Sequence, residues 1–234
     1  MNLTIFKNSL RRGFMNPTSL VANCALPLII LVFIADSDIN IMGMAQRSYH
    51  FVAITLMFGA FFMARGIQRD KIEGTVIRIL AGPVSMRSYL ISNFFASMVP
   101  MVGVSIALGV LGVVIHGWAL DFAALLTLCY ALLAATSIGL SFVWSCLFKD
   151  KETAGIAFSV TMMIVAFFSG LMIPLDDLPS IVFHVGALFP AHWAARAIDA
   201  LVLNGAENMF WISMLAMMLF AVAYLIYGGK RRII

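Results

Sequence analysis

Charged side chains that could make specific polar contacts are concentrated in one stretch, residues 69–85, between two long apolar runs. Its acidic and basic residues are Arg69, Asp70, Lys71, Glu73 and Arg78. Apolar residues recur among them at three- and four-residue steps, namely Ile72, Val76, Ile77 and Leu80. This spacing predicts a short amphipathic helix over residues 69–80. Such a helix suits contact with a docked partner or with lipid headgroups, and the pattern leaves both open.

Residue patterns for catalysis or nucleotide binding are missing from the chain. It has neither the His-Glu-x-x-His pattern of a zinc helix nor the Gly-x-x-x-x-Gly-Lys-Ser/Thr loop that cradles phosphates. The four histidines, His50, His116, His184 and His192, are expected to fill water-facing edges of the apolar runs. We therefore predict no catalytic residue, no metal site and no cofactor bound by this chain. If ATP drives the protein, another polypeptide binds it.

The composition is that of an integral membrane protein. The chain has 234 residues, of which 62% are hydrophobic and only 11% charged, with a mean hydropathy of +1.01. Soluble domains carry about 25% charged residues, so this chain would expose far too much apolar surface to water. We therefore expect the chain to lie in a lipid bilayer and to bind no nucleic acid. The length allows a single transmembrane domain over residues 1–234.

Six apolar runs are expected to cross the bilayer as helices. They cover approximately residues 20–35, 50–65, 89–115, 122–148, 153–171 and 209–227. Residues 2–13 mix apolar and basic side chains at near-helical spacing and predict a helix lying in the membrane interface. Gly82-Pro83 is expected to stop the amphipathic helix, and Ser85 to cap the third span. The predicted fold is thus all-α, with six transmembrane helices.

The segment 172–203, just before the last span, cannot form one straight helix because prolines interrupt it. Its apolar pieces, 181–189 and 194–203, are each too short to cross a bilayer. We expect two short helices that dip partway into the membrane, as re-entrant segments do.

The basic residues indicate the orientation. Of the 15 Lys and Arg residues, all except Arg47 and Arg196 fall on one side of a six-span arrangement. The acidic residues on that side are only Asp70, Glu73, Asp150 and Glu152. Because Lys and Arg are enriched in cytoplasmic loops, this side faces the cytoplasm. Both termini and the stretch 69–80 are then cytoplasmic, and the segment 172–203 is extracellular.

The predicted spans carry no Asp, Glu, Lys or Arg near their middles. Carriers that work alone usually mark their pathway with such charges. This disfavours a stand-alone channel or secondary carrier, which is kept as the alternative reading. A membrane enzyme and a non-transporting scaffold are further alternatives.

Residues 69–90, Arg-Asp-Lys-Ile-Glu-Gly-Thr-Val-Ile-Arg-Ile-Leu-Ala-Gly-Pro-Val-Ser-Met-Arg-Ser-Tyr-Leu, resemble the signature of the type-2 ABC exporter permeases. In that family, acidic residues and a Gly-Thr pair precede a leucine-rich turn, followed by Pro-Val-Ser and an aromatic residue. The matching positions are Asp70, Glu73, Gly74, Thr75, Pro83, Val84, Ser85 and Tyr89. The chain departs from the pattern at the leucine-rich turn, which reads Ile77-Arg-Ile-Leu80.

The resemblance implies a permease paired with a second copy, as a homodimer or with a sister subunit, above two ABC ATPase subunits that bind ATP and Mg²⁺. The interface helix and a coupling helix, residues 69–80, would contact the ATPases. The docking residues implied are Arg69, Asp70, Lys71, Glu73, Gly74, Thr75 and Arg78. The re-entrant segment would form an outer gate that includes Pro174, Asp176, Asp177, Pro179 and Pro190.

The resemblance also implies that the first, second and fifth spans of both copies surround a substrate route. The candidate lining residues are Phe51, Phe58, Phe61, Phe62, Phe158, Phe167 and Phe168. Each of them could instead pack against lipid or a neighbouring helix. A route lined by aromatic and aliphatic groups suits an amphipathic or hydrophobic substrate, such as a drug, a peptide or a lipid-linked glycan. The leading hypothesis is an exporter permease in the cell membrane that moves such a substrate outward.

Overall fold

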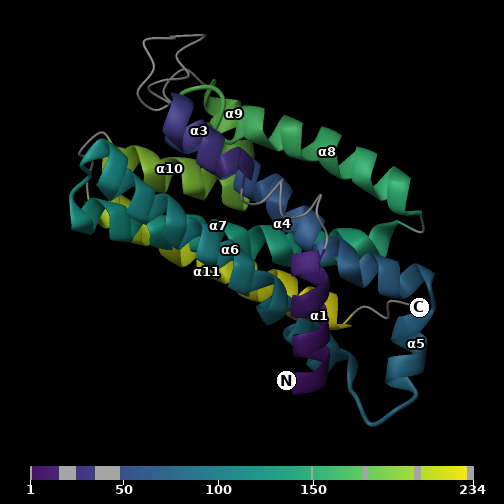
Figure 1. The fold of residues 1–234 in the computed structure, drawn as a ribbon. Coiled ribbons are helices and arrows are strands. Elements are labelled where there is room, and N and C mark those ends of the chain that lie inside the picture. The colour runs from purple at the N-terminus through teal and green to yellow at the C-terminus, as the bar shows by residue number, and fades with distance from the viewer. Residues whose placement is uncertain are drawn as a thin grey trace.

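The computed structural model describes residues 2–15, 25–34, 48–148, 150–175, 179–202 and 207–230. All the regular secondary structure within these ranges is helical, and the described residues contain no strand (Figure 1). The predicted all-α fold is confirmed for this part of the chain.

Four helices are long and apolar enough to cross a membrane. They are α4 (Ser48–Ile72), α6 (Met86–His116), α7 (Leu120–Leu147) and α11 (Glu207–Lys230). These helices correspond to the predicted second, third, fourth and sixth spans. The expected cap of the third span is present, since the Ser85 hydroxyl accepts a hydrogen bond from the Ser88 backbone amide at 3.3 Å.

The predicted fifth span, 153–171, is shorter in the structure. Helix α8 (Lys151–Phe168) has 18 residues and ends before 171. Gly170 adopts a φ of 86°, a left-handed conformation that ends a right-handed helix. A Cβ at Gly170 would lie only 2.2 Å from Leu175 Cδ2, so the packing there also requires glycine.

The remaining N-terminal helices are α1 (Leu3–Met15), which corresponds to the predicted interfacial helix, and α3 (Leu26–Ile34). Helix α3 has nine residues and is the described part of the predicted first span; the rest of that span lies outside the described residues. Among the described residues, four helices can cross a membrane, or five if the bent pair below counts as one span. The arrangement of six spans stays a prediction.

Two short helices, α9 (Ser180–Gly186) and α10 (Pro190–Val202), occupy most of the segment 172–203. The chain bends by 107° between them. Pro179 directly precedes α9 and Pro190 is the first residue of α10, a position where the missing amide hydrogen costs nothing. The prediction of two short helices in place of one straight helix is confirmed.

The stretch 69–80 is not a single helix as predicted. Helix α4 continues to Ile72, and a separate short helix, α5 (Thr75–Leu80), begins after Gly74. Gly74 has a φ of 65°, which breaks the helix and which a residue with a Cβ rarely adopts. The predicted apolar face is also interrupted, because Val76 is buried whereas Ile77 is 57% exposed.

Helix α7 lies at the centre of the bundle and packs against α4, α6, α10 and α11. Its buried side chains include Leu126, Tyr130, Leu133, Ala134 and Ile138. Gly109 of α6 allows close approach, since a Cβ there would lie 2.3 Å from Thr127 Oγ1 of α7. Gly103, further toward the start of α6, faces open space instead. Close packing against α7 thus fixes the long helices relative to one another.

The bundle has two distinct ends (Figure 1). The basic end is formed by α1, α5 and the last turn of α4, with Arg12, Arg69, Lys71 and Arg78. The far end is formed by α9, α10 and the first turn of α4. Helix α1 crosses the bundle near the basic end and packs against α6 and α4.

Candidate functional site

The last turn of α4, residues 68–71, contacts four other elements at the basic end. The Gln68 side chain donates a hydrogen bond to the backbone carbonyl of Asp150, at the start of α8, at 3.3 Å. Lys71 Nζ donates to the carbonyls of Ser145 and Phe148, at the end of α7, at 3.3 and 3.5 Å. Between these residues, Asp70 contacts α1 and α6. A movement of this turn would therefore pull on its hydrogen-bond partners in α1 and α6, at the end of α7 and at the start of α8.

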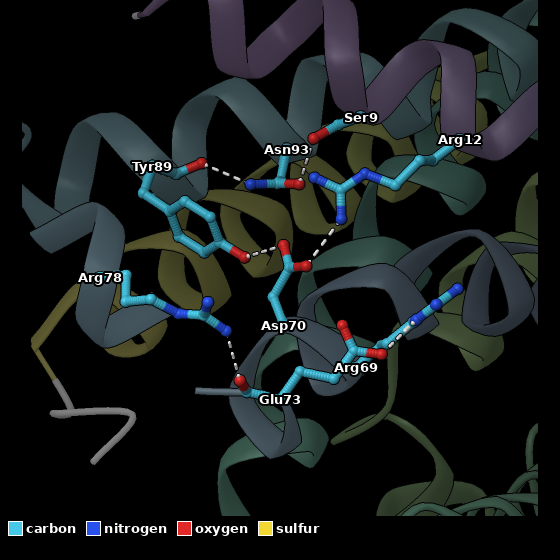
Figure 2. A network of polar contacts seen from close by, with 8 residues as sticks. All are labelled: Ser9, Arg12, Arg69, Asp70, Glu73, Arg78, Tyr89 and Asn93. Atoms are coloured by element: carbon cyan, nitrogen blue, oxygen red, sulfur yellow. Dashed lines mark hydrogen bonds and ion pairs between the residues drawn. The ribbon is translucent and has the colours of Figure 1, made fainter. Parts of the chain in front are cut away.

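Asp70 has a hydrogen-bond donor on each carboxylate oxygen (Figure 2). Arg12 Nη1 of α1 donates to Oδ1 at 2.6 Å, and the Tyr89 hydroxyl of α6 donates to Oδ2 at 2.7 Å. The Asp70 side chain is 3% exposed, whereas that of Arg12 is 48% exposed. A buried carboxylate is costly unless it is paired and hydrogen-bonded, and here both conditions are met. Asp70 thereby joins three helices through short, charge-assisted bonds.

A second set of hydrogen bonds holds α1 on α6 beside this ion pair (Figure 2). The Ser9 hydroxyl donates to Asn93 Oδ1 at 2.8 Å, and Asn93 Nδ2 donates to the Tyr89 carbonyl at 2.9 Å. At the start of the chain, the Asn2 backbone amide donates to the Ser92 hydroxyl at 2.8 Å. Helix α1 is thus a fixed part of the basic end rather than a loosely attached basic segment.

The outer surface of the same turn carries a second ion pair, and this pair is exposed. Arg69 Nε donates to Glu73 Oε1 at 2.7 Å, with side chains that are 63% and 49% exposed. Arg78 Nη2 donates to the Glu73 backbone carbonyl at 3.0 Å. The hydrogen bond from Arg69 lowers the pKa of the Glu73 carboxyl below its ordinary value. Ile72 and Ile77, also exposed, give this surface an apolar component beside the charges.

The seven residues predicted to dock a partner therefore separate into two groups. Arg69, Glu73 and Arg78 are exposed, with Gly74 and Thr75 half-buried between them. Asp70 is buried, and Lys71, half-buried, is bonded to α7. The prediction that Asp70 lies on the charged face of an amphipathic helix is wrong, because its carboxylate is buried against Arg12 of α1 and Tyr89 of α6. Successive residues of an α-helix point about 100° apart, so Asp70 faces inward while Arg69 faces outward.

The partners of Asp70 were not identified from the sequence. Arg12 counted only as one of the basic residues that orient the chain, and Tyr89 only as the aromatic position of the resembling motif. One signal was available: Asp70 and Tyr89 lie on either side of the short segment that connects two long apolar runs, so side chains from the ends of both helices can meet. No spacing rule links Arg12 to Asp70, because these residues are 58 positions apart.

The phenylalanines proposed to line a substrate route fall into three groups, which are packed together, exposed, or half-buried. Phe61 and Phe158 are buried and stack with ring centroids 3.9 Å apart, and Phe58 meets Phe158 edge-on. Phe167 and Phe168, at the end of α8, are 40% and 44% exposed. The remaining two, Phe51 and Phe62, are half-buried on α4. Their role in a route stays a prediction.

The far end contains the residues proposed for an outer gate. Pro174 and Pro179 are exposed and Pro190 is buried, while Asp176 and Asp177 lie outside the described residues. The structure adds a contact that the sequence did not reveal: His50 Nε2 of α4 lies 2.9 Å from Asp199 Oδ1 of α10.

Two of the four histidines do not lie at water-facing edges as expected. His50 is 2% exposed and His192 is fully buried. Packing of α10 against α4 and α7 covers them. Sequence position alone could not show this, because each residue lies at the start of a helix that would otherwise point its first turn toward water.

A comparison with protein families gives a match to a family described as ABC-2 family transporter protein, over residues 48–229. A search of curated proteins gave no match. The family match covers well over half of the chain and includes Asp70, Tyr89 and the far end, whereas Arg12 and the rest of α1 lie outside it. The chain is thus a multi-pass membrane protein, and it belongs to the ABC-2 transporter family as a permease.

Proposed function

We propose that this permease is the membrane subunit of an exporter and that its basic end is the cytoplasmic coupling site. In this proposal two ABC ATPase subunits bind ATP and Mg²⁺ beneath a pair of permeases, formed by two copies or by one copy and a sister subunit. Hydrolysis drives an amphipathic or hydrophobic substrate, such as a drug, a peptide or a lipid-linked glycan, from the cytoplasm or inner leaflet outward. Family membership implies the ATPase partner; the stoichiometry, substrate and direction are our proposal.

The observation that carries the proposal is the arrangement of one helical turn with two faces. Its outer face, with Arg69, Glu73 and Arg78, offers charges of both signs and exposed apolar side chains to a protein surface. Its inner face, through Asp70, is bonded to α1 and α6. A push on the outer face would therefore move the ends of several helices together. This is the mechanical requirement for coupling ATP hydrolysis on another chain to a change in the membrane.

The orientation in this proposal rests on the positive-inside rule. Arg12, Arg69, Lys71 and Arg78 lie at one end of the bundle, whereas Arg196 lies on α10 at the other. The basic end then faces the cytoplasm, where an ATPase can reach it. The bent pair α9 and α10 faces outside, in the position expected for an exit.

Charge reversal on the outer face tests the docking assignment. The variant that combines Glu73→Arg with Arg78→Glu reverses two exposed charges without touching Asp70. We expect it to lose the ATPase when the full-length permease is purified from native membranes, with co-purified chains identified by mass spectrometry. A single reversal at the far end, Glu207→Arg, also changes an exposed residue and should retain the ATPase. Retention of the ATPase by the double variant would show that docking occurs elsewhere.

A further inference from the structure

The contact between His50 and Asp199 connects the bent pair α9 and α10 to the long helix α4. His50 lies in the first turn of α4, with a side chain that is 3% exposed, and Asp199 lies on α10, with a side chain that is 24% exposed. Ionisable side chains inside membrane proteins are expensive and are kept mainly where they serve a function. The contact lies at the far end, away from the Asp70 network.

His50 gives α4 a polar contact with α10, a helix that packs, like α4, against α7. Helix α10 packs mainly against α7 and α11 and has a smaller contact with α4. The first turn of α4 is also tied to α7, since the Tyr130 hydroxyl donates to the Tyr49 carbonyl at 3.0 Å. The His50–Asp199 pair therefore adds a polar contact where the packing between α4 and α10 is small.

The polar atoms of the His50–Asp199 pair are not all hydrogen-bonded. This distinguishes the pair from a contact that holds two helices together permanently. The Nε2–Oδ1 separation of 2.9 Å meets the distance of an ion pair but not the alignment of a hydrogen bond, and Nδ1 of His50 has no hydrogen-bond partner among the described residues. His192, on the first turn of α10, is buried with neither ring nitrogen hydrogen-bonded among the described residues. Buried polar groups without partners cost free energy that hydration would return. Entry of water at the far end would thus be compensated by new hydrogen bonds to both imidazoles.

We propose that His50 and Asp199 form a polar latch that holds α10 against α4 and must release before the far end opens. The latch keeps the far end closed while the contact is made, and its release exposes the face of α4 one turn below His50. The identification of this opening with an exit for substrate rests on the proposed function; the latch itself does not. Its test is therefore made without ATPase, ATP or substrate.

The test measures how fast a buried cysteine reacts with a polar maleimide in the full-length permease reconstituted in nanodiscs. Cys24, Cys129 and Cys146 are first replaced by alanine. Ala53→Cys then places the reporter on α4 one turn after His50, at a position that is fully buried. We expect Asp199→Asn to raise the labelling rate about tenfold, the factor given by a shift of about 1.4 kcal/mol in the opening equilibrium. His50→Ala should act in the same direction.

Two controls decide between a latch and a general loosening. Ala64→Cys lies on the same helix toward the basic end, is 2% exposed, and should keep its labelling rate in Asp199→Asn. The exchanged pair, His50→Asp with Asp199→His, should return the Ala53→Cys rate to within about threefold of the parent, because the attraction is restored. Unchanged labelling at Ala53→Cys in Asp199→Asn would overturn the proposal. Equal acceleration at Ala64→Cys would also overturn it, because the pair would then only stabilise the fold.

Discussion

The basic end and the far end of the bundle each hold a pair of an acidic and a basic side chain of which one partner is buried, but they satisfy that buried partner to different degrees. At the basic end, both oxygens of Asp70 accept short hydrogen bonds, from Arg12 and Tyr89. At the far end, Asp199 lies near a histidine whose other ring nitrogen has no partner among the described residues. The arrangement at the basic end favours one rigid geometry of α1, α4 and α6. The arrangement at the far end gives the closed geometry of α4 and α10 only a small free-energy advantage over an open one. This difference suits the proposed function, in which the basic end receives force from an ATPase and the far end opens.

Removal of the positive charge from the Asp70 network should produce the largest effect. Arg12→Leu keeps an apolar stem against α6 but leaves the buried carboxylate with Tyr89 alone. Breaking a fully buried ion pair costs about 3–5 kcal/mol; because Arg12 is half-exposed, we expect a smaller loss of about 2–3 kcal/mol in unfolding free energy. Thermal unfolding of the detergent-solubilised protein measures it.

The matched change at the far end, Asp199→Asn, should cost about 1.4 kcal/mol in the same thermal unfolding assay, the amount by which it is expected to shift the opening equilibrium. This is less than the loss in Arg12→Leu, because the His50–Asp199 pair is only half-satisfied. Lys7→Leu removes a positive charge from an exposed position on α1. It is the control for the charge that is lost in Arg12→Leu. Equal losses in Arg12→Leu and Asp199→Asn would remove the difference between the two ends.

The hydroxyl of Tyr89 gives a finer comparison. Tyr89→Phe deletes only the hydrogen bond to the Asp70 carboxylate and should lower the unfolding free energy by about 1.5–3 kcal/mol, the range for hydrogen bonds to charged groups. Tyr130→Phe deletes a bond of similar geometry to a neutral carbonyl, that of Tyr49, and should cost about 0.5–1.5 kcal/mol. If the two variants unfold at the same temperature, the Asp70 carboxylate makes no special contribution at the basic end.

Much of the architecture could be predicted from the sequence because it depends on local patterns. The apolar runs located α4, α6, α7 and α11, and the prolines located the break between α9 and α10. Ser85 was recognised as a cap because the required hydroxyl precedes the helix directly. Each of these inferences uses residues that are near one another in the chain.

The candidate site was less predictable because its key contacts join distant segments. Asp70 and Glu73 have the same charge and belong to the same motif, yet one is buried and the other exposed. The difference arises from how far α4 continues, which depends on the conformation of Gly74 rather than on any amphipathic pattern. His50 and Asp199 are far apart in sequence, and neither carries a signal that names the other. Burial, which decides whether a charge is structural or available to a partner, emerges only after the helices pack.

The exposed Arg69–Glu73 pair provides the smallest and most specific prediction, since Arg69 is the direct neighbour of the buried Asp70. Because Arg69 lowers the pKa of Glu73, the pair stabilises the fold above the ordinary carboxyl pKa, and this contribution fades as pH falls through the lowered value. Arg69→Gln should raise the pKa of Glu73 while leaving the unfolding temperature nearly unchanged, because solvent screens the pair. Carbon-13 labelling of glutamate allows the titration to be followed by NMR, since the only glutamates are Glu73, Glu152 and Glu207. Arg78→Gln is the matched control: Arg78 donates to the Glu73 carbonyl rather than its carboxylate, so the pKa should rise less. An equal rise in both variants would mean that the general positive potential of the basic end, and not the Arg69 hydrogen bond, sets the charge of the surface proposed to meet the ATPase.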